Sequence, residues 1–276
     1  MDYNAAINNQ YGQTNLGSKI LTALKDEGKD SIECIQESLG RIEELHSRGK
    51  KATMELAHRA GLNKNMKVLD VGSGIGGPAR TLAFEFGVHV TGLDLCQEYC
   101  QAAKIINQRL ELSDMVEVQQ GNALEMPFDD ESFDLVMIQH VLMNVEDKEC
   151  LFSQVHRVLR SKGQLVIYTI CAGDTSPIHY PVIWANNSAL SFLLTPQKLL
   201  QLIKDSGFQE TFWKDDTPTI IEGFQSRKPK KLTTISRPIN FDLIIPNFSE
   251  KSRNIIRNFK EGRIVVIQGI FERRPI

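Results

Sequence analysis

Residues 68–79, VLDVGSGIGGPA, are the stretch from which the fold of this chain can be predicted. The apolar residues before Asp70 are typical of a buried strand. Pro78 fits the first turn of a following helix, where its missing N–H costs nothing. The spacing G-x-G-x-x-G is formed by Gly72, Gly74 and Gly77. Such a turn lets the backbone approach a ligand closely and points helix N-terminal N–H groups at it.

A second apolar stretch, VHVTGLDL at 88–95, contains Asp94. An acid about 20 residues after a glycine turn of this kind is expected to hold the two hydroxyls of a ribose. The glycine spacing alone is weak evidence. Because Asp94 lies in register with it, the two features together predict a cofactor that contains adenosine.

From residue 67 onward, apolar runs alternate with helical patterns. We predict strands at 67–71, 88–94, 115–119, 133–139 and 163–170, and helices at 78–86, 97–111 and 147–160, with a short helix after the third strand. This alternation is typical of a doubly wound α/β domain with a mostly parallel sheet. Ligands of such sheets bind beyond the carboxyl ends of the strands. We therefore expect the glycine turn, Asp94, residues 121–124 and residues 138–144 to line one cleft.

The two ends of the chain provide further helices. Ser18, and then Asp30 or Ser31, are expected to cap two helices, and residues 50–60 to form a third, which Gly61 ends. A helix at 196–206 and strands at 208–214 and 262–272 complete the prediction. We expect residues 1–49 to form an N-terminal helical lid. The cofactor-binding domain would span 50–276, with cap insertions near 171–195 and 215–262.

Composition narrows the class of protein. The 276 residues include 32 basic and 34 acidic side chains, so there is no basic excess of the kind that indicates nucleic-acid binding. The first 30 residues lack the apolar core of a signal peptide, and no apolar run reaches the roughly 18 residues of a membrane span. Five scattered cysteines favour reduced thiols, and no metal site is predicted. We expect a cytoplasmic protein that binds a small molecule, without nucleic acid or stable membrane insertion; a homodimer is left open.

Four motifs follow one another along the chain: VLDVGSGIGGPA, GLDL around Asp94, GNALEMPFDDESFDLV at 121–136 and HRVLRSKGQLVI at 156–167. Together they resemble class I S-adenosylmethionine-dependent methyltransferases. Residues 45–57, LHSRGKKATMELA, look like the branch that includes sarcosine and dimethylglycine N-methyltransferases. The resemblance implies a Rossmann-like, seven-stranded sheet whose last strand is antiparallel. Asn122 departs from the pattern, because many members carry Asp there.

The resemblance also implies roles around S-adenosyl-L-methionine. The glycine backbone would pass along its methionine part, Asp70 would favour its ammonium group, and Asp94 would accept both ribose hydroxyls. Asn122 and Ala123 would contact the adenine, with Gln139 near the sulfonium. The predicted cofactor-binding residues are Asp70, Gly72, Gly74, Gly76, Asp94, Leu95, Asn122, Ala123 and Gln139.

For the acceptor side we predict His140 and Tyr180 as catalytic residues. Histidine titrates near neutral pH, and His140 directly follows the fourth strand. The predicted substrate-binding residues are Tyr11, His46, His179 and Trp184. Rings such as Tyr180 and Trp184 can present their faces to a methylated ammonium, whereas a packing role in the core is the alternative for each. Arg48 and Arg263 are candidates to pair with a substrate carboxylate.

The predicted reaction is methylation of a small amine of the glycine, sarcosine or dimethylglycine type. The alternative within the same family is C- or O-methylation of a ring like that of a quinone or tocopherol. An oxygen or carbon nucleophile usually needs a base or a metal, whereas a neutral amine needs no base in the displacement itself. From different classes, an NAD-dependent oxidoreductase and a non-catalytic cofactor-binding protein are the alternatives.

Overall fold

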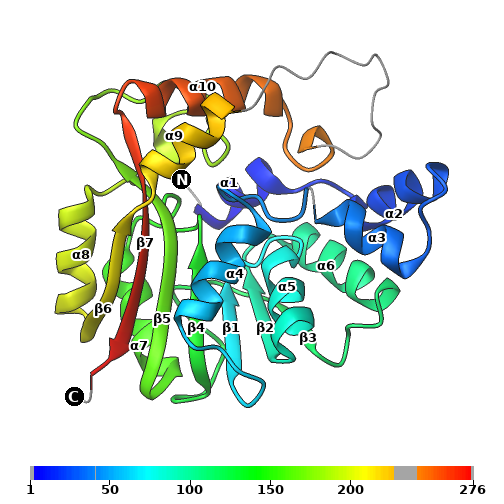
Figure 1. Ribbon diagram of the computed structural model, residues 1–276, viewed down its shortest axis with the longest axis horizontal. Helices are drawn as coiled ribbons and strands as arrows, with labels where there is room; N and C mark the ends of the chain where they lie inside the picture. Colours follow the sequence, from blue (N-terminus) through cyan, green and yellow to red (C-terminus); the bar gives the residue numbers. More distant parts are fainter. Residues whose placement is uncertain (1–2, 41, 227–240, 275–276) are drawn as a thin grey trace.

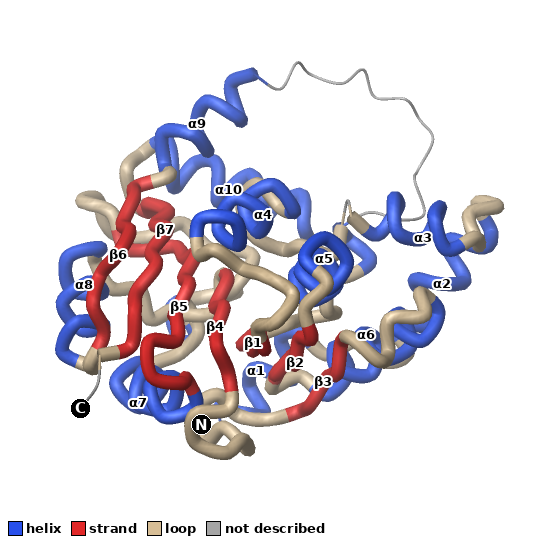
Figure 2. The backbone as a smooth tube through the Cα atoms, turned by 60° about the horizontal axis from the view of Figure 1, so that its bottom comes forward, coloured by secondary structure: helices blue, strands red, loops and turns tan. Residues whose placement is uncertain are grey.

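The computed structural model describes residues 3–40, 42–226 and 241–274. One seven-stranded sheet runs through it in the order β3-β2-β1-β4-β5-β7-β6, with helices on both faces (Figures 1 and 2). The strands are β1 Lys67–Val71, β2 His89–Asp94, β3 Val116–Gln120, β4 Phe133–Gln139, β5 Leu159–Ala172, β6 Phe208–Asp215 and β7 Ile264–Arg273. Strand β7 is antiparallel to both of its neighbours, and strands β1 to β5 pair in parallel. The predicted fold class is confirmed.

The helices precede, connect and follow the strands. They are α1 Tyr3–Tyr11, α2 Leu16–Asp26, α3 Ile32–Leu39, α4 Lys50–Arg59, α5 Gly77–Phe86, α6 Gln97–Arg109, α7 Lys148–Val158, α8 Pro196–Asp205, α9 Thr217–Ser226 and α10 Phe248–Lys260, with short 3-10 helices at Ser188–Leu190 and Phe241–Leu243. The predicted helix after β3 does not form. Asn122 instead closes a turn, because its side-chain oxygen accepts the Leu124 N–H at 2.9 Å.

Side chains alternate between the two faces of the sheet, as the pleat requires. In β1, Val68 packs in the cluster that includes α4, α5, α9 and α10, whereas Leu69 packs in the cluster beneath α7 and α8. Both are completely buried. Strand β1 pairs with β2 on one side and with β4 on the other, so β2 and β3 extend the sheet in one direction and β4 and β5 extend it in the other. The loops that follow β1 and β4 therefore diverge and leave room for a ligand.

The N-terminal helices are fixed to the rest of the molecule through α6. Leu16 and Ile20 of α2 and Ile35 of α3 share a buried cluster with Ile106 of α6. Of the two predicted caps for α3, Asp30 and Ser31, the structure has Ser31, which accepts the Cys34 N–H at 3.3 Å. The prediction for Ser18 is wrong.

Helix α2 begins earlier than predicted, at Leu16, and its N-cap is Asn15 in the left-handed conformation. Helix α1 was not predicted, because its nine residues carry no apolar stripe of helical spacing. Helix α1 is held in position by tertiary contacts of buried residues such as Ile7.

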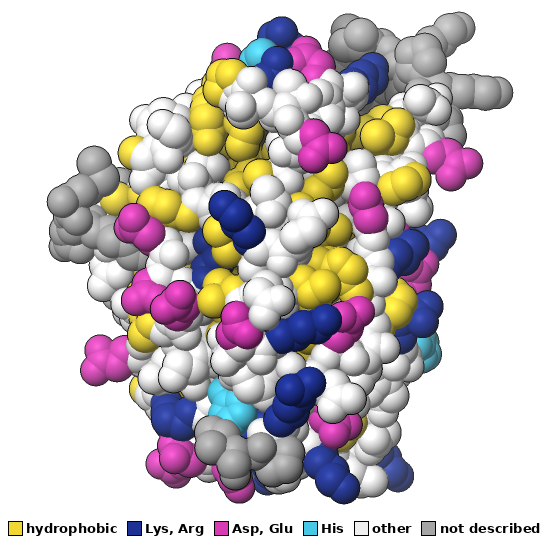
Figure 3. Space-filling view, turned by 90° about the vertical axis from the view of Figure 1, so that its left-hand side faces the viewer, with side chains coloured by type: hydrophobic (Ala, Val, Ile, Leu, Met, Phe, Trp, Pro, Cys, Tyr) yellow, Lys and Arg dark blue, Asp and Glu magenta, His cyan; other side chains and the backbone are white. Residues whose placement is uncertain are grey.

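Helices α9 and α10 lie between β6 and β7 in the chain and cover the upper end of the sheet in Figure 1. Figure 3 shows the side of the molecule that carries α8 and β6, where charged side chains of both signs are scattered among small hydrophobic patches. Such charges protect an edge strand from pairing with another chain. None of the described helices is both long enough and apolar enough to cross a membrane. The division into a lid at 1–49 and a domain at 50–276 stays a prediction.

Candidate functional site

A cavity of about 370 Å³ lies at the carboxyl ends of β1 to β4. The loops after all four strands line this cavity, as expected for the glycine turn, Asp94, residues 121–124 and residues 138–144. Seven of the nine predicted cofactor-binding residues line this cavity: Gly72, Gly74, Asp94, Leu95, Asn122, Ala123 and Gln139. The other two are not among the lining residues: Asp70 lies in β1, and Gly76 is the residue before α5.

The glycine turn after β1 requires residues without a side chain. Gly72, Gly74 and Gly76 all have positive φ, at 72°, 56° and 85°. A Cβ atom on Gly72 would lie only 2.1 Å from a methyl carbon of Val141. The turn is closed by the Gly72 N–H, which donates to the carbonyl of Leu93 at 2.7 Å. Helix α5 begins directly after it, with its N-terminus at the cavity.

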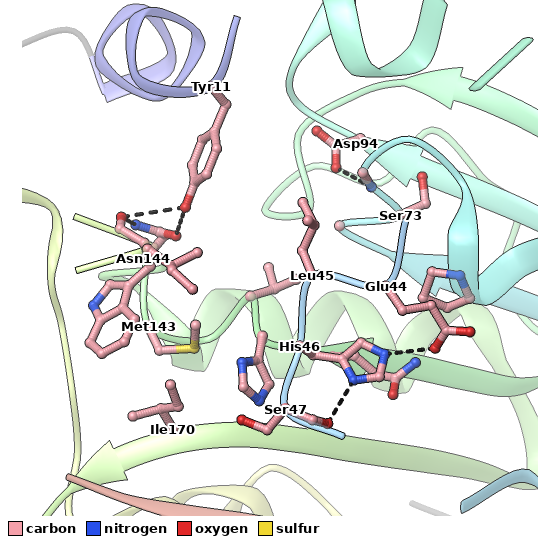
Figure 4. Close-up of a pocket in the computed structure, with 18 of the residues that line it drawn as sticks. Tyr11, Glu44, Leu45, His46, Ser47, Ser73, Asp94, Met143, Asn144 and Ile170 are labelled. Atoms are coloured by element: carbon pink, nitrogen blue, oxygen red, sulfur yellow. Dashed lines mark hydrogen bonds and ion pairs between the residues drawn. The ribbon is translucent and has the colours of Figure 1, made fainter. Parts of the chain in front are cut away.

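Asp94 holds the glycine turn from the neighbouring strand. Its carboxylate accepts the N–H of Gly74 and the N–H of Cys96, each at 2.8 Å. Figure 4 shows Asp94 beside Ser73 at one end of the cavity. Burial raises the pKa of Asp94, and the two backbone hydrogen bonds oppose that rise. Asp94 therefore ties the end of β2 to the turn after β1.

Asp70 and Ser73 contribute buried polar atoms that have no partner among the described residues. These are Oδ2 of Asp70 and Oγ of Ser73. Burial, with the nearby carboxylates of Asp94 and Glu44, raises the pKa of Asp70 to about 8. Buried polar atoms without hydrogen bonds destabilise the folded state. The turn therefore fits a ligand that brings a hydrogen-bond donor and a positive charge to it, such as an ammonium group.

Two predicted contacts with the cofactor are already used within the chain. The side-chain oxygen of Asn122 accepts the Leu124 N–H, which fixes the orientation of its amide group. Gln139 is buried, and its amide lies 3.3 Å from Oγ1 of Thr53 and 3.2 Å from the sulfur of Met137. Both side chains are fixed in place before any ligand binds.

A polar network around Glu44 forms the floor between the two ends of the cavity (Figure 4). Oε2 of Glu44 lies 3.0 Å from Nε2 of His46. The same carboxylate accepts hydrogen bonds from Thr53 at 2.5 Å and from Thr81 at 2.6 Å. Burial alone would raise the pKa of Glu44, but these hydrogen bonds and the charge of His46 lower it. Sequence reasoning missed Glu44, because no spacing pattern marks it.

His46 is thereby held in a defined orientation. Its Nε2 faces Glu44, and its Nδ1 lies 3.1 Å from the carbonyl oxygen of Ser47. The centre of its ring is 5.9 Å from that of His140 and 5.8 Å from that of Tyr168. The structure therefore brings two predicted site residues, His46 and His140, to the same place.

His140 adopts the left-handed backbone conformation, with φ of 53°. Its backbone N–H donates to the carbonyl of Tyr168 at 2.7 Å, which anchors it to β5. The side chain lines the cavity, and its Nε2 is buried without a hydrogen-bond partner among the described residues. Burial, and to a smaller extent the nearby His46, hold the pKa of His140 well below its usual value. The ring is therefore neutral at physiological pH, and the unpartnered Nε2 faces no competing hydrogen bond from the described residues.

Tyr11 and Trp184 line the far side of the cavity. The Tyr11 hydroxyl donates to Oδ1 of Asn144 at 3.0 Å, and Nδ2 of Asn144 donates to the Trp184 carbonyl at 2.8 Å. The indole N–H of Trp184 donates to Ser191 at 2.9 Å. Trp184 lies in a turn of the loop after β5.

The structure does not bring His179 and Tyr180 into the cavity. Nε2 of His179 lies 2.8 Å from Glu261, and its backbone N–H donates to Asn258. Tyr180 is half-buried against the cluster beneath α9 and α10, and neither residue belongs to the described cavity lining. Asn258 of α10 fixes the backbone of this loop, because its side chain bonds both the N–H and the carbonyl of His179.

The two arginines proposed for a substrate carboxylate both have partners of their own. Arg48 lines the cavity but is paired with Glu55 at 2.6 Å and with Asp216 at 2.8 Å. Arg263 is paired with Glu261 at 2.6 Å. Within the described part of the chain, no group of three or more His, Cys, Asp or Glu side chains is arranged to hold a metal ion.

The segment that forms most of the cofactor end of this site matches a known protein family. Residues 69–167, which include the glycine turn, Asp94 and His140, match the family described as a methyltransferase domain. The resemblance to class I S-adenosylmethionine-dependent methyltransferases is thereby confirmed for this segment, and the oxidoreductase alternative is not supported.

The methyltransferase domain is similar to proteins that act on different acceptors. A sterol 24-C-methyltransferase of Gibberella zeae is 40% identical over 113 residues, which are 41% of this chain and 30% of that protein. A sarcosine/dimethylglycine N-methyltransferase of Halorhodospira halochloris is 30% identical over 158 residues, 56% of each chain. The chain thus matches less than two thirds of the length of either relative.

One solved structure with the same fold matches nearly the whole chain. Geranyl diphosphate C-methyltransferase of Streptomyces coelicolor, in complex with Mg²⁺, geranyl diphosphate and S-adenosyl-L-homocysteine, superposes with a TM-score of 0.70 and 18% identity. The superposition covers 99% of this chain and 98% of that one. The fold therefore extends over the N-terminal helices and the segment between β6 and β7.

Proposed function

We propose that this protein transfers the methyl group of S-adenosyl-L-methionine to an oxygen or carbon nucleophile of a small molecule. The donor carries its methyl group on a positively charged sulfur, which is a good leaving group. Few covalent steps are then left to the protein, whose main tasks are to align the nucleophile with the methyl carbon and to exclude water. The observation that carries the proposal is the buried, neutral His140, whose Nε2 is without a partner at the cavity.

The cofactor end of the cavity supports this proposal through its own polar atoms. Asp70, with an unpartnered Oδ2, would receive the ammonium group, and Asp94 would accept the ribose hydroxyls. The backbone of the turn can approach the ligand closely because Gly72 and Gly74 have no side chains. The remaining predicted contacts are Leu95, Asn122, Ala123 and Gln139.

His140 would act on the acceptor. An acceptor hydroxyl would donate a hydrogen bond to Nε2 of His140 and lose its proton to that atom as the oxygen bonds to the methyl carbon and the carbon–sulfur bond breaks. A general base of this kind contributes typically 10²–10⁴-fold to a rate.

A second candidate is the small amine that the sequence predicts. It is favoured by the N-methyltransferase among the relatives and by Trp184, whose ring lines the cavity and offers a face to a cation. A neutral amine loses no proton before it attacks, so this candidate gives His140 no role as a base. The two candidates therefore differ in what they predict for a His140 variant.

The first experiment is calorimetric titration with S-adenosyl-L-homocysteine, with NAD as the comparison. We expect the thioether to bind and NAD not to bind, and Asp94→Ala to weaken thioether binding by at least tenfold, since it removes a charged acceptor of hydrogen bonds. Unchanged affinity in Asp94→Ala would overturn the assignment of the cofactor site.

The second experiment measures formation of S-adenosyl-L-homocysteine with 2-naphthol and with sarcosine as trial acceptors. We expect turnover of the phenol, and His140→Ala should lower kcat by at least 100-fold while the affinity for S-adenosyl-L-homocysteine stays within about threefold. His179→Ala is the matched control, because that histidine lies outside the described cavity lining. Turnover of sarcosine that is independent of His140 would favour the amine candidate.

A further inference from the structure

The end of the cavity away from the cofactor site is lined mainly by hydrocarbon side chains. In Figure 4, Asp94 and Ser73 lie at one end, and Met143 and Ile170 lie at the other. Beyond the residues labelled there, this apolar end is completed by Ile183, Ile220, Phe224 and Ile255. These side chains come from the loop after β5 and from α9 and α10. We call this end, from Met143 to Ile255, the acceptor chamber.

Charged side chains do line the cavity, but each already has partners. Within the described part of the chain they are Glu43, Glu44, Arg48 and Asp94. Glu43 is paired with Arg80, Glu44 with His46, Arg48 with Glu55 and Asp216, and Asp94 with two backbone N–H groups. Arg48 is the one lysine or arginine among the described lining residues, and both of its partners are carboxylates.

The arrangement discriminates against charged acceptors. A carboxylate or phosphate that entered the chamber would lose its hydration and would find no free cationic side chain among the described lining residues. To recruit Arg48 it would have to displace Asp216, a completely buried carboxylate that would then keep one ion pair, with Lys214 at 2.9 Å. An uncharged hydrocarbon group carries no such cost and gains from burial.

We propose that the acceptor is an uncharged hydroxyl compound with an apolar body, whose hydroxyl lies at His140 and whose body fills the acceptor chamber. This inference rests on the proposed function and narrows its substrate class. The chamber does not suit two charged compounds on which similar proteins act. These are sarcosine, which carries a carboxylate, and geranyl diphosphate, which carries a diphosphate. The preference for an uncharged acceptor is then determined by side chains of α9 and α10, and the cofactor site does not contribute to this preference.

The test compares two probes of nearly the same shape on the full-length protein saturated with S-adenosyl-L-homocysteine. The probes are 2-naphthol and 6-hydroxy-2-naphthoic acid, titrated at pH 7, where the carboxyl group of the second probe is ionised. We expect 2-naphthol to bind at least tenfold more tightly. Equal or tighter binding of the acid would overturn the proposal, and so would the failure of both probes to bind.

A charge placed in the chamber provides the matched variant. Phe224→Lys puts a cation at the lining of the chamber and should reduce or reverse the preference for 2-naphthol. Gln225→Lys adds the same charge one residue later, at an exposed position outside the described lining, and should leave the preference unchanged. An equal effect of both variants would contradict the role of the chamber.

Binding of S-adenosyl-L-homocysteine is measured in each variant and separates the two proposals. If the thioether does not bind to the unmodified protein, the proposed function fails. The probe titrations on the ligand-free protein would then still report whether the chamber prefers the uncharged molecule.

Discussion

The affinity for S-adenosyl-L-homocysteine should fall steeply as the pH is lowered from 8 to 6, because of Asp70. This carboxyl is buried, and its pKa in the ligand-free protein is raised to about 8. The ammonium group of the ligand binds only to the ionised form in our proposal. Binding at lower pH must therefore first remove a proton, and the apparent Kd equals the intrinsic Kd divided by the ionised fraction of Asp70. For a pKa of about 8 the expected loss between pH 8 and pH 6 is about 50-fold.

The assay is isothermal titration calorimetry at pH 6, 7 and 8 in buffers that differ in ionisation enthalpy. At pH 7 about 0.9 proton should be released for each ligand bound, since that fraction of Asp70 is protonated before binding. Asp70→Asn is the matched variant, because asparagine has the same shape and does not titrate. It should bind about 30-fold more weakly than the unmodified protein at pH 8, through the loss of a charged hydrogen bond of about 2 kcal/mol, with a much flatter pH dependence. An identical Kd at pH 6 and pH 8, or the same slope in Asp70→Asn, would refute this role of Asp70.

Three further predictions concern stability and can be checked by chemical or thermal unfolding. Gly72→Ala should lower the free energy of unfolding by more than Gly28→Ala does. Both positions have positive φ, which costs about 1–2 kcal/mol for alanine, but only the new Cβ atom at position 72 would also clash with Val141. Equal losses in the two variants would argue against that contact. Arg80→Met should cost about 3–5 kcal/mol by leaving the buried Glu43 without its partner, and the double variant with Glu43→Leu should recover most of this loss, which a purely local packing defect would not do. Ser31→Ala should cost about 1 kcal/mol as a lost helix cap, whereas Ser18→Ala, at an exposed position inside α2, should change stability by less than about 0.5 kcal/mol.

The sheet could be predicted because its strands are short apolar runs bounded by turn residues. Strands β1 and β4 were predicted at their observed bounds. Strand β5 begins at Leu159, earlier than its apolar run indicates, because Leu159 pairs with Phe133 across an irregular register. Hydrogen bonding to a neighbouring strand extended β5 into a polar segment, and no periodicity within the segment itself marks that extension.

The cofactor end of the site was predictable for the same reason. Its residues belong to one local motif, the glycine turn, or follow directly after strands whose ends must meet at one edge of the sheet. Glu44 was missed because its importance comes from contacts with Thr53 and Thr81, which lie in α4 and α5. His179 was expected at the cavity on the basis of its position after the fifth strand, but its pairing with Glu261 of the segment before β7 is visible only in three dimensions.

This difference between the two ends of the cavity has a consequence for function. The cofactor end is made from the turns after the parallel strands, whose positions are fixed by the pairing of β1 with β2 and β4. The acceptor chamber takes most of its lining from α9, α10 and the loop after β5, which no sheet register positions; Ile170 of β5 is the exception among the chamber residues named above. Residues there can change without disturbing the glycine turn or Asp94. Domains similar at the cofactor end can therefore act on acceptors as different as a sterol and sarcosine, and the acceptor must be inferred from the chamber of each protein rather than from the shared motifs.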